Sequence, residues 1–401
     1  MLGHKDHGKS TLIGRMLIAS GKVTPDRINE AKRASSEAGV EFEPAFLLDT
    51  FSDERELGMT FDNTRVQISH EDTLFELIDV PGHEELMKSM LSGSSSADIG
   101  VVVVSAKGDE GITDQTRRHV YVAKMFGVGR FVVAVNKMDL SGFDEETFKS
   151  LKAEISEFLQ NIGLGKQDFE VIPISARGDV NIVRTDAAVK WYSGRSLFES
   201  LVALAHESCN TLSLPSDPRL IIQSVVPRNG ATAILGKVIS GEMKPGMKMT
   251  VFPGSQDIEV TEILKGMKKA GSAHKGESVA LMAAGPVGGD VRGSILGTRS
   301  FNGKVSNSIR AHIFFVEPLR EELSLLLMDV PVKVVSVTVD EVIEPSSGRR
   351  RKGSEVRPLE TAIVRITLGK EIAFDSFARC RELGGIVLAH NSRLVGSGIV
   401  I

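Results

Sequence analysis

Along the first half of the chain, short apolar runs alternate with helix-like stretches. The apolar runs, each about as long as one buried strand, are Leu74–Asp79, Gly100–Ser105, Arg130–Val135 and Val171–Ile174. The helix-like stretches around them are Ser10–Ser20, Glu84–Ser92, Asp114–Phe126 and Glu145–Asn161. Because strands that alternate with helices usually pair in parallel, this pattern predicts an α/β domain, mostly parallel, with helices on both faces of its sheet.

The alternation stops after Leu204. Residues 207–218 contain two prolines and several small polar residues, which is typical of a linker. The strand-like runs that follow it, divided by Gly, Pro and Asn turns, are Leu220–Val226, Thr232–Ser240, Met247–Phe252 and Ser278–Ala283. Short strands at this spacing predict a small β-barrel.

A second break, Ser300–Ser308, divides the remaining chain. The strand-rich block after it ends in Ile386–His390 and Gly396–Ile401. We therefore expect three domains: the α/β domain over residues 1–206 and two β-barrels over residues 218–300 and 303–401. No repeat of fixed period is visible.

Composition narrows the class of protein. Hydrophobic residues make up 41% and charged residues 25% of the chain, as in ordinary globular proteins. The apolar run Ile99–Val104 is far shorter than the roughly 20 residues that a membrane span needs. Cys209 and Cys380 form no CxxC motif, and no signal-peptide pattern opens the sequence. These features exclude disulfide scaffolds, zinc modules and integral membrane proteins, so we expect a cytoplasmic protein without a membrane partner.

Charge is unevenly distributed along the chain. The net charge is −4 overall, with −10 in residues 1–213, +4 in residues 214–302 and +2 in residues 303–401. Mildly basic barrels permit contact with a polyanion such as tRNA, although such small biases can also carry no meaning. The run Arg349–Lys352 lies between small polar residues and is typical of a solvated hairpin tip.

The segment Gly3–Ser10 fits the pattern G-x-x-x-x-G-K-[ST] and opens a helix-like stretch. In such a loop, glycines let backbone N–H groups curl around phosphate oxygens, and the following helix adds its positive end. Lys9 can reach the β- and γ-phosphates, and the Ser10 hydroxyl can ligate Mg²⁺. The residues expected at the phosphates are Gly3, His4, Lys5, Asp6, His7, Gly8, Lys9, Ser10 and Thr11.

The segment Asp79-Val80-Pro81-Gly82 follows the first apolar run, which places Asp79 at the carboxyl end of a strand. There its carboxylate can hold Mg²⁺ through a water molecule, while the Gly82 N–H can reach the γ-phosphate. An aspartate at a strand end can instead cap the next helix, so this motif alone leaves both roles open.

Two further motifs favour guanine. Asn136-Lys137-Met138-Asp139 follows a strand, and the Asp139 carboxylate can accept hydrogen bonds from both N1–H and the N2 amino group of guanine, which adenine cannot offer. Ser175-Ala176 follows the next strand and can present backbone N–H groups to guanine O6, and Arg177 is also expected at the nucleotide. Four motifs in the right order, each at its expected place, predict a P-loop domain that binds GTP or GDP.

Several segments resemble the translational GTPase superfamily. They are Arg55–Thr60, His83 directly after the Asp-x-Pro-Gly motif, Gln115-Thr116-Arg117, Trp191–Gly194, Glu382–Gly385 and Val395–Ile399. The chain is most similar to the branch that contains elongation factor 1-alpha and the GTPase subunit of sulfate adenylyltransferase. The resemblance implies a GTP-binding domain followed by two β-barrels. It also implies that Thr60 ligates Mg²⁺, that His83 positions the attacking water and that Lys9 neutralises developing charge.

The chain departs from the family pattern at three places. Lys5 replaces a small apolar residue of the phosphate loop, and Met59 replaces an isoleucine. Only Met1 and Leu2 precede the phosphate loop, so we expect the central strand that P-loop domains place there to be cut short.

The resemblance implies a GTPase that delivers aminoacyl-tRNA or a tRNA-like protein to the ribosome, with a nucleotide exchange factor as a further partner. One alternative is the regulatory GTPase subunit of sulfate adenylyltransferase, with an adenylyltransferase subunit as its partner. Another is a ribosome-rescue or specialised-tRNA factor.

Overall fold

The computed structural model describes residues 1–48, 65–79, 97–107, 111–208, 217–228, 230–266, 268–328, 330–353 and 355–401. The chain divides into two compact units. One comprises Met1–Leu212 with Pro345–Arg349, and the other comprises Ser213–Glu344 with Arg350–Ile401. In the described parts of the chain, no helix is long and apolar enough to cross a membrane.

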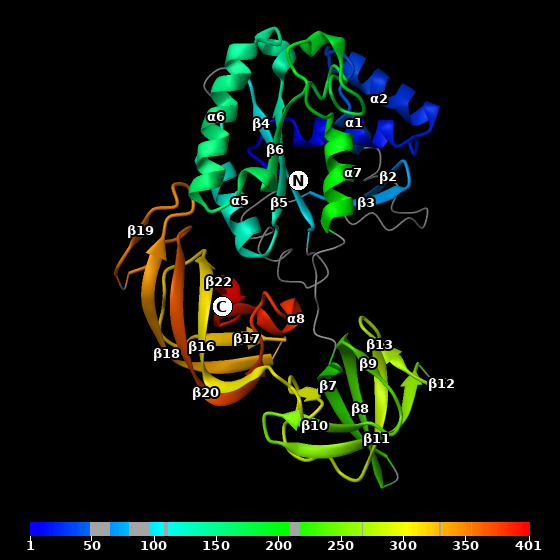
Figure 1. Ribbon diagram of the computed structural model, residues 1–401, viewed down its shortest axis with the longest axis vertical. Helices are drawn as coiled ribbons and strands as arrows, with labels where there is room; N and C mark the ends of the chain where they lie inside the picture. Colours follow the sequence, from blue (N-terminus) through cyan, green and yellow to red (C-terminus); the bar gives the residue numbers. More distant parts are fainter. Residues whose placement is uncertain are drawn as a thin grey trace. The chain divides into compact units, whose positions relative to one another are not determined.

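A four-stranded parallel sheet with the order β1-β4-β5-β6 forms the centre of the first unit (Figure 1). Its strands are β1 (Leu2–Gly3), β4 (Ile99–Ser105), β5 (Arg130–Asn136) and β6 (Phe169–Pro173). Nearly every residue of β4 and β5 is buried, because both faces of a parallel sheet are covered. The predicted α/β domain is confirmed. Three of the four apolar runs correspond to strands of this sheet, whereas Leu74–Asp79 corresponds to a strand that pairs outside it.

The first strand of the sheet is short. β1 pairs with β4 through Leu2 and Gly3 alone, so the strand that we expected to be cut short is present as two residues. A separate antiparallel pair consists of β2 (Arg65–His70) and β3 (Thr73–Ile78). The Met1 amino group donates a hydrogen bond to the Ile78 carbonyl oxygen at 2.6 Å, which places the end of β3 beside β1.

Three helices confirm the sequence pattern: α1 (Lys9–Ala19), α5 (Asp114–Met125) and α6 (Glu145–Asn161). The helices α2 (Pro25–Glu37) and α7 (Leu197–Ser208) were not predicted. α2 buries only Ala31 and Ser35, so apolar periodicity hardly marks it. α7 extends into residues 207–218, which we expected to be linker. The predicted helix Glu84–Ser92 lies outside the described residues.

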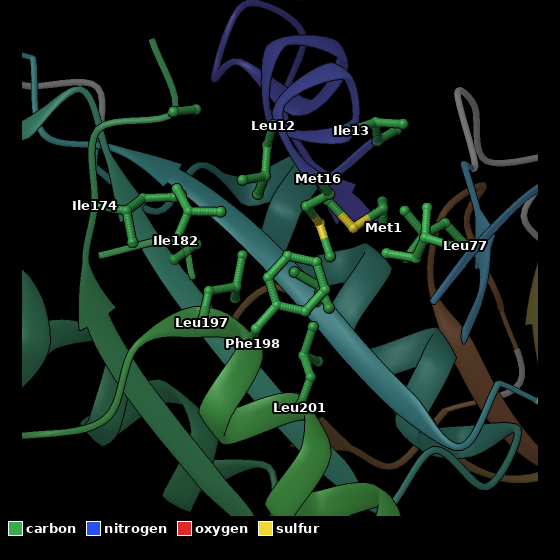
Figure 2. Packing of buried hydrophobic residues seen from close by; sticks show 14 of the residues in the cluster. Met1, Leu12, Ile13, Met16, Leu77, Ile174, Ile182, Leu197, Phe198 and Leu201 are labelled. Atoms are coloured by element: carbon green, nitrogen blue, oxygen red, sulfur yellow. The ribbon is translucent and has the colours of Figure 1, made fainter. Parts of the chain in front are cut away.

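The core on one face of the sheet lies between α1 and α7 (Figure 2). Its helical side chains are Leu12, Ile13 and Met16 of α1 and Leu197, Phe198 and Leu201 of α7. Val101 and Val103 of β4 belong to this core, whereas Val102 and Val104 are buried on the opposite face, where α5 packs against β4. This packing fixes the position of α1. It thereby also fixes the phosphate loop, which leads directly into α1.

The second unit contains two six-stranded antiparallel barrels, as the sequence predicts. The strands of the first are β7 (Arg219–Arg228), β8 (Ala231–Ser240), β10 (Lys248–Phe252), β11 (Gln256–Lys265), β14 (Ser278–Ala284) and β15 (Ile295–Gly297). They follow the order β10-β15-β7-β8-β14-β11, and pairing of β10 with β11 closes the ring. The small strand β12 (Lys268–Ala270) pairs with β11, and β9 (Glu242–Met243) and β13 (Ala273–His274) pair with each other.

The strands of the second barrel are β16 (Lys304–Phe315), β17 (Ser324–Leu327), β18 (Val330–Ile343), β20 (Thr361–Phe374), β21 (Gly385–His390) and β22 (Arg393–Val400). Pairing of β17 with β18 closes this ring, and the helix α8 (Arg381–Gly384) precedes β21. The break expected at Ser300–Ser308 already contains strand from Lys304, because Lys304 pairs with Phe374. The run Arg349–Lys352 is exposed, as expected, and contains β19 (Arg350–Arg351).

A fully buried arginine joins the two barrels. The Arg219 guanidinium donates to Asp217 at 2.8 and 3.1 Å, to Asp375 of the second barrel at 2.8 Å and to Asn302 at 2.7 Å. Its carbon Cζ also lies 5.0 Å from the centre of the Phe301 ring. Burial lowers the pKa of Arg219, but the hydrogen bonds and charges of the two aspartates outweigh burial and raise it. A buried charge is tolerated here because every side of it is paired.

Candidate functional site

The loops that follow β1, β5 and β6 meet at the carboxyl edge of the sheet, where nucleotides bind to open α/β sheets. A cavity of about 550 Å³ opens there. Its lining residues are Lys5, Asp6, Gly8, Lys9, Ser10, Thr11, Glu43, Lys107, Asn136, Lys137, Asp139, Leu140 and Arg177. Residues from the phosphate loop and from the Asn136 and Ser175 motifs are therefore gathered around one space.

The phosphate loop depends on two glycines. Gly3 has φ +142°, and a Cβ atom on it would lie 2.4 Å from the Val103 carbonyl oxygen. Gly8 precedes α1 in the left-handed region, with φ 88°. The loop therefore passes closer to β4 than a larger residue would permit, and it turns sharply into the helix.

Lys9 closes the phosphate loop from within. Its Nζ donates hydrogen bonds to the carbonyl oxygens of Gly3 and His4, both at 3.0 Å. Burial lowers the pKa of Lys9, and the neighbouring charges of Asp79 and Asp6 partly oppose that shift. The ammonium group therefore lies inside the loop, where an incoming phosphate can replace carbonyl oxygens as its partner.

Asn136 connects the phosphate loop with the segment Ser175–Arg177, at the end of the cavity where the sequence predicts guanine (the guanine end). Its Nδ2 donates to the His7 carbonyl oxygen at 2.9 Å, and its Oδ1 accepts from the Ala176 N–H at 2.9 Å. A Cβ atom on Gly8 would lie 2.5 Å from Asn136 Nδ2. Asn136 is buried, so these contacts give it a positioning role between two loops.

The guanine end contains one uncommitted carboxylate among the described lining residues. Asp139 lies in the turn Met138–Ser141, and its side chain is exposed to the cavity. The N–H groups that we expected to face guanine O6 are engaged within the protein, because Ser175 donates to the Val180 carbonyl oxygen and Ala176 to Asn136. Asp139 is thus the group best placed to select a base.

Asp79 fits a role in holding a magnesium ion. It follows the end of β3, close enough to Lys9 for its charge to oppose the lowering of the lysine pKa by burial. Its Oδ1 is buried and accepts no hydrogen bond from the described residues. A buried carboxylate oxygen without a donor suits a hard cation, and the exposed Ser10 hydroxyl lies at the start of α1.

Some of the remaining predicted residues lie at or beside the cavity, and others fall outside the described residues. Lys5 and Asp6 are exposed at the cavity, whereas His7 is buried, with Nδ1 3.2 Å from the Val103 carbonyl oxygen. His4 Nδ1 lies 2.6 Å from the Lys5 carbonyl oxygen. The residues predicted to sense the γ-phosphate or to act in hydrolysis beside Lys9, namely Thr60, Gly82 and His83, lie outside the described residues.

Three lining residues were not predicted: Glu43, Lys107 and Leu140. Lys107 lies two residues beyond β4, so its position after a parallel strand was a usable indication. Leu140 directly follows Asp139. Glu43 lies between α2 and the end of the first described segment, in a stretch whose sequence shows neither helical nor strand periodicity.

Comparison with known families gives one consistent result. Residues 1–210 match the family described as the elongation factor Tu GTP binding domain. Residues 216–296 match elongation factor Tu domain 4, and residues 310–401 match the GTP-eEF1A C-terminal domain-like family. The three matches follow one another along the chain.

The matches to curated relatives cover the whole chain. Elongation factor 1-alpha of Saccharolobus solfataricus is 31% identical and that of Sulfurisphaera tokodaii 30% identical, each match covering 100% of this chain and 95% of the relative. A solved structure of Sup35 complexed with GDP is 23% identical with a TM-score of 0.45, covering 100% of this chain and 92% of that one.

A P-loop domain with this guanine motif, followed by two antiparallel barrels, defines the translational GTPases. The chain belongs to that family, through the elongation factor Tu GTP-binding domain, and it is a GTPase. Within the family it is of the elongation factor 1-alpha type, because both its third domain and its full-length relatives belong there.

Proposed function

We propose that the chain is a GTP-dependent switch that carries aminoacyl-tRNA, or a tRNA-like protein, to the ribosome in the cytoplasm. The observation that carries this proposal is the unbroken order of three elongation-factor domains along the chain. The functional domains are residues 1–206, 218–300 and 303–401. The net positive charge of the two barrels suits an RNA partner.

The proposed reaction is transfer of the γ-phosphoryl group of GTP to water. Asp139 selects the guanine base, and Lys9 supplies a positive charge next to the phosphates. Ser10, Thr60 and Asp79 would hold Mg²⁺, with Asp79 acting through water. When bound, that ion neutralises charge on the phosphate oxygens. His83 orients the attacking water, and Gly82 contacts the γ-phosphate.

The two elongation factors 1-alpha named above favour delivery of aminoacyl-tRNA over the two alternatives. A direct test measures how fast the ester bond of aminoacyl-tRNA hydrolyses in the presence of the protein. The GTP-loaded protein is expected to slow deacylation, and the GDP-loaded protein is not. Equal deacylation rates in both states, together with GTPase activity that ribosomes do not stimulate, would overturn the proposed delivery role. If an adenylyltransferase subunit stimulates the GTPase activity and ribosomes do not, the sulfate-activation alternative is identified.

Replacement of His83 by alanine is expected to slow single-turnover GTP hydrolysis by about 10²-fold, because it removes water positioning and no phosphate contact. GTP affinity is expected to stay within a few-fold. The matched control is His206→Ala, since His206 is exposed on α7. Rapid-quench measurement of both variants checks this, and equal rates for His83→Ala and the unsubstituted protein would remove His83 from the mechanism.

A further inference from the structure

An ion pair connects two distant segments at the nucleotide cavity. The Arg177 guanidinium donates a hydrogen bond to the Glu43 carboxylate, although the two residues are 134 positions apart in the chain. Both side chains line the cavity. Glu43 is largely buried, with 16% of its side chain exposed, whereas Arg177 is 47% exposed.

Glu43 is held on the phosphate side of the cavity. Its backbone N–H donates to Ser35 Oγ at 2.9 Å, and its carboxylate accepts a hydrogen bond from Thr11 at the start of α1. The next residue, Pro44, lies directly on α1, because a Cβ atom on Gly14 would be 2.1 Å from the Pro44 carbonyl oxygen. Only glycine at position 14 permits this approach, so Glu43 has a defined place against the helix.

Arg177 is held on the guanine side. Arg15 of α1 donates to the carbonyl oxygens of Ala176 and Arg177, with 3.0 Å to the former. The pKa of Arg177 is raised, mainly by its hydrogen bond with Glu43 and further by the charge of Asp139. Arg177 therefore lies near Asp139, and its pairing with Glu43 connects the segment after β6 with the segment after α2 at the cavity.

We propose that Glu43 and Arg177 form a latch over the nucleotide cavity, and that this latch limits the rates at which GDP and GTP enter and leave. The inference rests on the guanine-nucleotide site of the proposed function. If the ion pair must open before a nucleotide can enter or leave, it raises the free-energy barriers to association and to dissociation. It therefore slows both rates. A contact made directly to the bound nucleotide would instead slow dissociation alone and strengthen affinity.

The pairing also has an electrostatic consequence. Burial alone would raise the pKa of the Glu43 carboxyl, but its hydrogen bonds from Arg177 and Thr11 hold that pKa below its ordinary value. The carboxylate therefore stays charged near the phosphate site, and Arg177 neutralises it. Without the latch, an unpaired Glu43 would repel phosphates, whereas an unpaired Arg177 would not.

The test uses the full-length chain and tritiated GDP, because the radioactive label adds no chemical group to the nucleotide. Association and dissociation rates are measured for Glu43→Gln, Arg177→Gln and the double variant. The matched control is Arg195→Gln, which removes the surface ion pair of Arg195 with Glu170 at 3.0 Å in the same domain. Thermal melting checks that each variant folds.

For Glu43→Gln, both rates are expected to rise by about fivefold, with the equilibrium affinity changed by less than about twofold. The double variant is expected to exchange GDP no faster than the faster single variant, because either single substitution already removes the ion pair. Raising the salt concentration is expected to speed exchange in the unsubstituted protein more than in the double variant. Arg195→Gln is expected to leave both rates unchanged.

Three results would overturn the latch. Unchanged rates would mean that the ion pair does not obstruct passage. Faster dissociation with unchanged association would mean that Glu43 or Arg177 binds the nucleotide directly. Absence of GDP binding to the unsubstituted protein would overturn the latch together with the nucleotide site, whereas the first two results leave the proposed switch function standing.

Discussion

Asp139→Asn is expected to weaken GTP binding by about 2–4 kcal/mol, or about 30- to 700-fold, and to create binding of xanthosine triphosphate. The carboxylate of Asp139 is exposed to the cavity, next to the loop that Asn136 holds in place. It can accept two hydrogen bonds from the guanine edge, and asparagine replaces one acceptor by an amide donor. That donor suits the additional carbonyl oxygen of xanthine.

Calorimetric titration with GTP, ATP and xanthosine triphosphate measures this change. The control is Asp114→Asn, which alters an exposed carboxylate in the first turn of α5 and is expected to leave all three affinities unchanged. Equal affinity of the unsubstituted protein for ATP and GTP would refute the role of Asp139. A variant that loses GTP without gaining the xanthine nucleotide would mean that Asp139 acts by shaping the loop.

Arg219→Ala is expected to lower the free energy of unfolding of the barrel unit by about 3–5 kcal/mol, because it removes the short ion pair of the buried Asp375 carboxylate. Asp375 then keeps only the longer ion pair with the exposed Arg379, at 3.6 Å. Asp375 is 4% exposed and Asp217 is 20% exposed, so water cannot replace the guanidinium at Asp375. Asn302 loses its hydrogen bond at the same time. The loss falls on the contact between the two barrels.

Urea unfolding of the full-length chain measures this loss. Arg310→Ala is the matched control, since it removes the half-exposed ion pair of Arg310 with Asp340 at 3.3 Å and is expected to cost less than about 1 kcal/mol. If both variants shift the urea midpoint equally, the buried network contributes no more than a surface pair. In that case the barrels are held together by their apolar contacts.

Part of the fold follows from local pattern. Val101–Val104 and Phe131–Val135 are apolar throughout because a strand buried on both faces has no solvent side, and each lies in a strand of the sheet. α6 was equally clear, since Asp144 caps its first turn by accepting a hydrogen bond from the Thr147 N–H at 2.7 Å. α2 escaped prediction because it buries two small side chains and is otherwise polar.

The residues of the candidate site could likewise be predicted from short stretches of sequence. A phosphate loop needs glycine where the backbone passes close to a neighbouring strand or takes a positive φ, and Gly3 and Gly8 are at those positions. The carboxylate that we propose to select guanine, Asp139, lies directly after a strand, as the pattern requires. These requirements act on consecutive residues, so the order of residues alone was enough to recognise a GTP-binding domain followed by two barrels.

Contacts between distant segments depend on the folded chain. Pairing of Glu43 with Arg177 and of Arg219 with Asp375 joins residues 134 and 156 positions apart. No periodicity marks such partners, because a charged side chain has the same sequence context whether it is solvated or paired. Their energy comes from burial and mutual distance, which arise only when strands and helices pack. The N–H of Ala176 is a further example. The sequence predicts that it binds guanine, but in the fold it donates its hydrogen bond to Asn136.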